Sequence, residues 1–494
     1  DGLIYPGTLF PVGTSAQAAK SAAAIKTPLS GVVRVIVILA DFSDKPMTTP
    51  KEHFEDLFFS VGKVATGSVR EYYREVTHGK IDIQGEVVGA YRMPKTIAQY
   101  AHGDSGTGNT LPNARTLAKD AAVAANPAIN FANYDNDKDG FVDAFIVIHA
   151  GRGGEETGNA NDIWSHKWVL DGGAYNADGS RIYAYLTVPE DCKLGVCAHE
   201  LGHLLFGFPD LYDADYSSEG IGNWCLMAGG SWNNGGLTPA HPSAWCKAQQ
   251  NWVTTVNQVG NQDGITIEDV KTGFKVHRLW KNGTAGKEYF LVENRQKTLF
   301  DKFLPGSGLL IWHIDEAISG NTNDSHYQVA LMQADGKKDL EKNANRGDAG
   351  DCFPGTAAKK DFTDSSTPGS KSYAGSATSV SVTNIVVERA NIIANFKVTA
   401  STRLTPVARQ TIAEILKTDA AKNIDMKFAL PTAGLAAMPD LESVSLEQRV
   451  DYLETLLSSL QSSGEKKLED FGGNEDDNEQ YSADDAGANP TGKV

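Results

Sequence analysis

The sequence contains no apolar run of about 18 residues, the length that a membrane-spanning helix needs. Positive charge is also scarce, because 45 Lys and Arg stand against 62 Asp and Glu, for a formal net charge of −17. Such a field repels the phosphates of nucleic acids and anionic lipids. We therefore expect neither a transmembrane segment nor a nucleic-acid partner, and the oligomeric state stays open.

Cysteine is sparse as well, so that at most two disulfides can form. The five residues are Cys192, Cys197, Cys225, Cys246 and Cys352. We interpret the first four as the pairs 192–197 and 225–246, although spacing does not fix connectivity, and buried free thiols are the alternative. Disulfides and the two N-x-[S/T] sequons are typical of an extracellular protein, so we expect secretion.

Signals for nucleophilic catalysis are missing. No G-x-S-x-G segment presents a serine. Cys197 stands two residues before a histidine, but no further argument supports a cysteine protease.

The chain of 494 residues exceeds one ordinary hydrophobic core, so several domains are expected. Residues 1–30 are rich in Ala and Ser and resemble an arm or a propeptide remnant. Residues 31–258 mix strands with helices, whereas residues 259–399 hold short strands between Gly, Asp and Asn, typical of a β-sandwich. Residues 400–464 carry amphipathic helices, and the acidic residues 465–494 are expected to be disordered. The predicted fold class is α+β.

Hydrophobic periodicity predicts the elements around the centre of interest. Strands are expected at 31–42, 81–91 and 141–151, and helices at 68–80, 114–126 and 195–207.

The most informative segment is H-E-L-G-H at residues 199–203. His199 and His203 are four residues apart, so one helical turn places both imidazoles on one face, where they can chelate Zn2+. Glu200 lies beside the metal without binding it, and there it can act as general base and then as general acid. A helix with two ordinary histidines is the alternative, but chance alone produces H-E-x-x-H rarely.

A catalytic zinc site takes three protein ligands and leaves one position open. Gly207 ends the expected helix, and Asp210 in the following turn is our choice as third ligand. The contenders are the carboxylates of Asp213, Asp215 and Glu219. Met227, in a Gly-rich loop, is expected to form a hydrophobic floor beneath the metal, although a lone Met is more often core filler.

Several segments together resemble the immune inhibitor A family of metallopeptidases. They are SVREYYREVTHGKIDIQGEV, DNDKDGFVDAFIVIHAGRGGE, IWSHKW, HELGHLLFGFPDLYD, GNWCLMAGGSWN, LPGSGLLIWHIDE and NRGDAGDCFPG, spread over residues 31–395. The resemblance implies a metzincin-like zincin domain, with His199 and His203 as zinc ligands, Glu200 as base and Met227 in the Met-turn.

One departure from that family concerns the turn after the second histidine. The family has Gly three residues and the acidic ligand six residues after it, whereas here Phe206 is third, Gly207 fourth and Asp210 seventh. Because Gly207 can adopt an unusual backbone angle, we expect the longer turn to absorb the extra residue.

The segment DNDKDGFVD resembles a calcium-binding loop. Its ligands would be the carboxylates of Asp135, Asp137, Asp139 and Asp143 and the carbonyl of Phe141. Position 12 of the loop is Ile146 rather than Glu, so the loop is not a complete EF-hand, and an acidic turn is the alternative. Asp348 and Asp351 form a weaker calcium candidate.

His166 is a candidate for orienting substrate, although a buried structural histidine is the commoner case. Taken together, the residues predict a secreted zinc metalloendopeptidase that hydrolyses proteins or peptides and also binds calcium. Two other readings stay open: a calcium-dependent adhesion protein with a structural zinc, and a latent form whose cleft is covered by residues 1–30 or 400–494.

Overall fold

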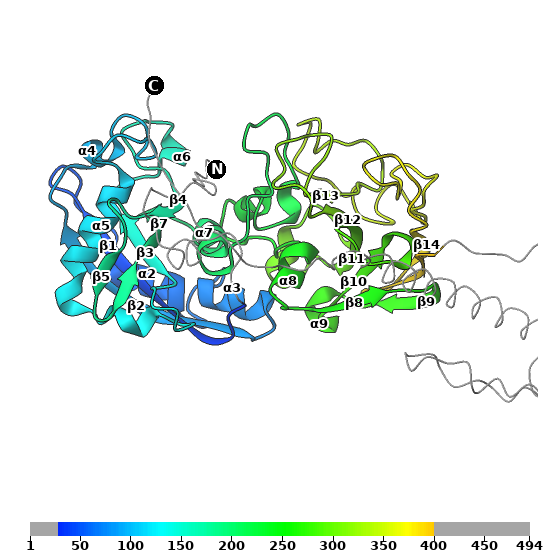
Figure 1. Cartoon of the computed structure of the whole chain (residues 1–494), viewed down its shortest axis with the longest axis horizontal. Coiled ribbons are helices and arrows are strands. Elements are labelled where there is room, and N and C mark those ends of the chain that lie inside the picture. The colour runs from blue at the N-terminus through cyan, green and yellow to red at the C-terminus, as the bar shows by residue number, and fades with distance from the viewer. Residues whose placement is uncertain (1–27, 400–494) are drawn as a thin grey trace, which may run out of the picture. The chain divides into compact units, whose positions relative to one another are not determined.

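The computed structural model describes residues 28–399, which form a mixed α/β unit (Figure 1). The expected segments 400–464 and 465–494, and nearly all of the expected N-terminal arm, lie outside the described residues. Among residues 28–399, no helix is both long and apolar enough to cross a bilayer.

The first sheet contains five strands in the order β2-β1-β3-β7-β4. Its members are β1 (Gly31–Asp41), β2 (Ile81–Arg92), β3 (Phe145–His149), β7 (Ala184–Pro189) and β4 (His166–Val169). The pairs within β2-β1-β3-β7 are parallel, and β4 joins β7 antiparallel. β4 is therefore the outer strand of the sheet on one side.

The strands of this sheet form where the sequence has β-branched apolar runs. All residues of β3 and β7 are buried, as expected for parallel strands covered on both faces. The strands predicted at 31–42 and 81–91 are confirmed with small shifts at their ends, whereas the strand at 141–151 is shorter than predicted, at Phe145–His149.

Helices α2 (Lys51–Phe59), α3 (Val69–Val76), α4 (Ile97–Ala101), α5 (Ala114–Ala125), α6 (Gly154–Thr157) and α7 (Leu194–Phe206) belong to the same part of the chain. The helix predicted at 68–80 begins as expected, because the Ser68 side chain accepts from the backbone N–H of Glu71, and the Glu71 carboxylate accepts from the Ser68 N–H. The helices predicted at 114–126 and 195–207 are also confirmed as α5 and α7.

Residues beyond 253 form two further sheets. One has the order β13-β12-β11-β10-β8 and the other β14-β15-β9. Their strands are β8 (Thr254–Gln258), β9 (Gln262–Ile267), β10 (Lys275–Trp280), β11 (Glu288–Arg295), β12 (Gly308–Asp315), β13 (Val329–Leu331), β14 (Ser381–Glu388) and β15 (Asn391–Lys397). The two sheets share an apolar cluster that includes Leu279 and Ile311 from one and Val382 and Phe396 from the other.

The main hydrophobic core extends across the boundary expected near residue 258. It contains Val37 and Ile148 from the first sheet, Leu201 from α7, and Leu310 and Trp312 from β12. Helix α8 (Ala244–Gln249) adds the buried Lys247, whose ammonium group meets the buried carboxylate of Glu293 on β11. Residues 31–258 and 259–399 thus contribute to the same hydrophobic core. Their division into two domains stays a prediction.

Candidate metal centre

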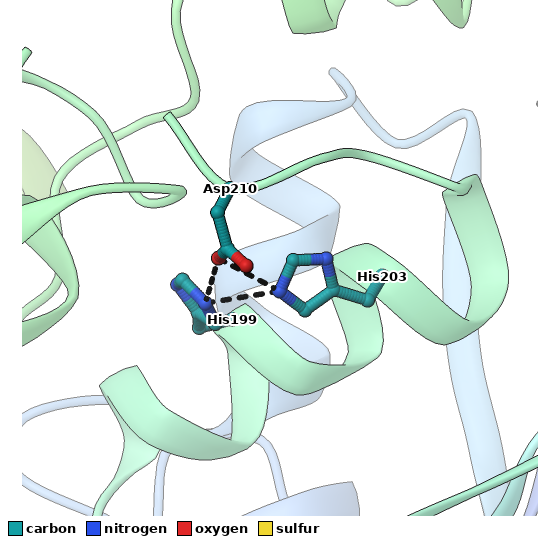
Figure 2. A group of neighbouring side chains, drawn as sticks. All are labelled: His199, His203 and Asp210. Atoms are coloured by element: carbon teal, nitrogen blue, oxygen red, sulfur yellow. Dashed lines mark hydrogen bonds and ion pairs between the residues drawn. The ribbon is translucent and has the colours of Figure 1, made fainter. Parts of the chain in front are cut away.

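Helix α7 carries the H-E-L-G-H segment, and every residue from Leu194 to Phe206 is buried. The helix ends at Gly207, whose φ of 66° lies in the left-handed region where glycine has no steric cost. The chain then turns back over the helix through Pro209. This turn brings Asp210 above the face that carries His199 and His203 (Figure 2).

Three side-chain atoms converge at this point (Figure 2). The Nε2 atoms of His199 and His203 are 3.1 Å apart. The Oδ1 atom of Asp210 lies 3.3 Å from Nε2 of His199 and 3.2 Å from Nε2 of His203. These three edges agree with the edge of a tetrahedron around Zn2+, which is about 3.3–3.4 Å for metal–ligand bonds of roughly 2.0–2.1 Å. The donor set of two imidazoles and one carboxylate therefore fits zinc.

The opposite ring nitrogens orient the two imidazoles. Nδ1 of His199 lies 2.8 Å from the backbone carbonyl of Leu226, and Nδ1 of His203 contacts the backbone carbonyl of Phe208. A carbonyl can only accept, so each Nδ1 carries the proton and each Nε2 presents its lone pair to the centre. Burial lowers the pKa of His199, which favours the neutral, ligating form.

The turn after α7 places Asp210 but none of the contending carboxylates among these ligand atoms. Asp213 instead accepts hydrogen bonds from Ser217 and Ser218, and Glu219 pairs with Arg346 at 3.1 Å. Asp210 lies beside the two histidines although the turn has one residue more than the family pattern, and its role as third ligand stays a prediction.

Glu200 is buried next to the three converging side chains, with 2% of its surface exposed. Its Oε2 has no hydrogen-bond partner among the described residues. Burial first, and then the carboxylates of Asp210 and Glu155, raise the pKa of Glu200 well above its usual range. A desolvated carboxylate of this kind is suited to take up and release a proton.

Met227 lies beneath the helix at Gly202, the residue directly before His203. A β carbon at position 202 would stand 2.7 Å from the Met227 sulfur, so glycine is what allows this contact. The backbone carbonyl of Met227 also accepts from the N–H of Leu211, next to Asp210. Sequence reasoning included Met227 but missed Gly202 and the two carbonyls that hold the histidine rings.

His166, the candidate for orienting substrate, is buried at the start of β4. Its Nδ1 lies 2.7 Å from the carbonyl of Trp164, and its Nε2 lies 2.8 Å from the hydroxyl of Tyr185. Burial lowers its pKa to about 4. A role toward substrate stays a prediction, since both nitrogens have protein partners.

The acidic loops gather carboxylates in two further places. Asp135, Asp137 and Asp143 bring ligand atoms within 4.8 Å of one another, and Oδ1 of Asp135 is buried without a hydrogen-bond partner among the described residues. The Asp139 side chain accepts from the N–H of Phe141. Calcium there stays a prediction.

Asp348 approaches Asp335 and Asp339, two residues that sequence reasoning did not single out. Asp351, the predicted partner of Asp348, instead accepts from the indole N–H of Trp224 at 2.9 Å. The pair Asp348 and Asp351 as calcium ligands stays a prediction, and the geometry groups Asp348 with different carboxylates.

The five cysteines are buried free thiols in the structure. The predicted pairs are nevertheless neighbours, because Cys192 interacts with Cys197 and Cys225 with Cys246 through their side chains. Disulfides at these positions stay a prediction.

Residues 31–262 match the model of the immune inhibitor A peptidase M6 catalytic domain. These residues are an immune inhibitor A peptidase domain. The resemblance predicted from the sequence is thereby confirmed, and the M6 domain, a metallopeptidase domain, contains the converging His199, His203 and Asp210.

Two curated proteins are similar to part of this chain. "Pre-pro-metalloprotease PrtV" of Vibrio cholerae is 33% identical over 269 residues, which cover 43% of this chain and 29% of that protein. "Immune inhibitor A" of Bacillus thuringiensis subsp. alesti is 33% identical over 230 residues, which cover 38% of this chain and 33% of that protein. The chain thus spans about a third or less of the length of these relatives.

Proposed function

We propose that the chain is a secreted zinc-dependent metalloendopeptidase that hydrolyses peptide bonds of protein substrates. The observation that carries this proposal is the triangle of the two Nε2 atoms and the Asp210 oxygen, with edges of 3.1, 3.2 and 3.3 Å, beside the unpartnered carboxylate of Glu200. A structural zinc site is closed by four protein ligands, whereas three ligands beside a free carboxylate are typical of a hydrolytic site.

His199, His203 and Asp210 would hold the metal. Bound zinc supplies Lewis-acid polarisation of the scissile carbonyl and lowers the pKa of water. The backbone carbonyls of Leu226 and Phe208 keep the two imidazoles in the ligating tautomer, and burial excludes competing water.

Glu200 is the proposed proton carrier. It takes a proton from the attacking water, holds it while the tetrahedral species collapses, and gives it to the leaving amine nitrogen. The Oε2 atom of Glu200 has no hydrogen-bond partner among the described residues, so it is free to hold the proton between these two transfers.

The surrounding fold supports a metzincin-like arrangement and a peptide substrate. Met227 underlies the helix at Gly202, as a Met-turn residue would. β4 is the outer strand of its sheet, and an outer strand offers backbone groups to which an extended peptide can add. Trp164 and Ser165, directly before β4, border the pocket that also contains Glu200.

We further propose calcium at Asp135, Asp137 and Asp143, supported by the unpartnered and buried Oδ1 of Asp135. Secretion and the two disulfides belong to the same proposal. Intact mass before and after thiol alkylation tests the disulfides of secreted material, and five alkylated cysteines would rule them out.

The main test replaces Glu200 by Gln. The variant is expected to keep stoichiometric zinc and to lose casein hydrolysis by at least about a hundredfold, because only the proton carrier is removed. The matched control is Glu268→Gln, an exposed carboxylate outside the site, which should hydrolyse casein like the unaltered chain. Undiminished cleavage by Glu200→Gln would refute the mechanism. Zinc binding without turnover in the unaltered chain would instead favour the adhesion protein.

A further inference from the structure

A pocket opens beside the proposed proton carrier and is shaped by four segments of the chain. Glu155 comes from α6, Trp164 and Ser165 precede β4, Val196 belongs to α7, and Trp232 comes from the 3-10 helix η4 (Gly229–Trp232). His199 and Glu200 also line it. The empty space between these residues is about 270 Å3 and includes open solvent, so the pocket is a small recess that can receive the end of a side chain but not a whole small ligand.

The carboxylate of Glu155 is held in a fixed position. Its Oε2 accepts from the backbone N–H of Ser165 at 3.0 Å, and its Oε1 accepts from the hydroxyl of Ser165. The carboxylate also folds over Gly153, where an added β carbon would stand 2.5 Å from its Cδ. A side chain held by two hydrogen bonds and packed against a glycine can bind a partner with little loss of entropy.

The carboxylate of Glu155 can still accept further hydrogen bonds. An ionised carboxylate offers about four acceptor directions, and Ser165 occupies two of them. The neighbouring cationic side chains form ion pairs with other carboxylates. Arg152 pairs with Glu156 and Asp191, and Lys193 pairs with Glu156 at 2.8 Å. Within the described part of the chain, no ion pair involves Glu155. Its negative charge can therefore pair with a cationic group that enters the pocket.

The walls of the pocket favour a cation as well. Trp164 and Trp232 are both partly exposed there, and indole faces attract ammonium and guanidinium groups. Lys193 already lies over the Trp232 ring, 5.7 Å from its centroid. Two indoles beside an unpaired carboxylate form an environment suited to a planar guanidinium or an ammonium group.

We propose that this pocket is a specificity subsite in which Glu155 selects an arginine or lysine side chain of the substrate, next to the scissile bond. The inference rests on the proposed peptidase function. A basic side chain lying between Trp164 and Trp232 would donate to the open acceptor directions of Glu155, and its backbone would then lie along the start of β4, within reach of Glu200.

The test compares two peptides that differ only at the position that fills the pocket, one with arginine and one with the uncharged, similarly long norleucine. Cleavage of a proteome-derived peptide library by the full zinc-loaded chain first locates that position. The ratio of kcat/KM for arginine over norleucine is expected to fall by roughly tenfold or more in Glu155→Gln, since a charge-assisted contact is lost. Glu268→Gln, which removes the charge of an exposed glutamate outside the pocket, is the control and should keep the ratio.

A second measurement separates this inference from the peptidase function itself. Zinc-loaded Glu200→Gln binds peptides without turning them over, so calorimetry should show tighter binding of the arginine peptide than of the norleucine peptide. If Glu155→Gln does not fold, Trp232→Leu replaces it and is expected to lower the same ratio. A library without a basic preference, or a ratio unchanged in Glu155→Gln, overturns the subsite; absence of any cleavage by the zinc-loaded chain overturns the peptidase function.

Discussion

The sulfur of Met227 lies against Gly202, within the turn of α7 that joins the two histidines, so closely that a β carbon there would be 2.7 Å away. Gly202→Ala should therefore reduce the free energy of unfolding. Alanine favours a helix by about 1 kcal/mol over glycine, but overpacking costs about 1–3 kcal/mol, so the net effect is a loss of up to about 2 kcal/mol. Urea unfolding measures it.

A matched control for this change is Gly286→Ala, since a β carbon at position 286 meets nothing within 4 Å. Zinc affinity should also fall in Gly202→Ala, because Met227 follows the carbonyl that holds His199. A Gly202→Ala variant more stable than the unaltered chain would contradict the packing argument.

Asp210→Ala should lower zinc affinity by more than about a hundredfold, because it removes one of the three proposed ligand atoms. Asp215→Ala serves as the control, since this contending carboxylate lies outside the ligand group. Zinc content after dialysis against graded chelator gives the affinity. Equal retention of zinc by both variants would show that Asp210 is no ligand.

Calcium should raise the melting temperature of the unaltered chain and should do so much less in Asp135→Asn. A bound ligand stabilises by an amount that grows with its concentration, by about 2.7 kcal/mol at a hundredfold excess over Kd. Asp171→Asn, outside both clusters of carboxylates, is a suitable control. Thermal unfolding in calcium and in magnesium distinguishes a specific site from general screening; an equal response of both variants would argue against the site.

Stability is expected to fall as the pH drops from about 6.5 toward 4, partly because of His166. Burial lowers the pKa of His166 to about 4, whereas an unfolded histidine titrates near 6.5. In this window the unfolded chain binds a proton that folded His166 does not, so unfolding is favoured by up to about 1.4 kcal/mol per pH unit. His166→Gln removes this contribution.

The measurement is the free energy of unfolding from pH 7 to pH 4 in both proteins. The slope should be shallower in His166→Gln. It should not vanish, because burial also lowers the pKa of His277 to about 4. Parallel curves would show that His166 titrates normally in the folded chain.

Glu293→Gln should destabilise strongly, by about 3 kcal/mol or more, because it leaves the fully buried ammonium of Lys247 without its counter-charge. The double variant Lys247→Met/Glu293→Gln should be more stable than Glu293→Gln alone, since the orphaned charge is then absent. Chemical unfolding of the single and double variants gives the coupling energy. A double variant less stable than Glu293→Gln would contradict this view.

Much of the fold could be predicted from the sequence because its signals are local. The β-branched run of β1, the Ser68 cap of α3 and Gly207 at the end of α7 each act within a few residues. The H-E-L-G-H spacing likewise places the two proposed histidine ligands on one helical face, and it needs no long-range information to do so.

The parts that sequence reasoning missed depend on distant segments. Glu155 on α6 stands 45 positions before Glu200 on α7. No spacing rule predicts that two residues so far apart in the sequence border the same pocket. The carbonyls of Leu226 and Phe208 are backbone groups, which carry no residue-type signature. Asp335 and Asp339 lie close to Asp348 because of the course of an irregular loop, which the sequence pattern does not predict.

The family match ends at residue 262, but several polar groups inside the matched region have their hydrogen-bond partners beyond that residue. The carboxylate of Asp301 accepts from the backbone N–H of His241, and that of Glu75 accepts from the N–H of Phe300. A recombinant fragment that ends at residue 262 would lack Asp301 and Phe300, the partners in these two hydrogen bonds. It would also lack Glu293, the counter-charge of Lys247. Expression of this protein for biochemistry should therefore retain the chain at least through residue 399.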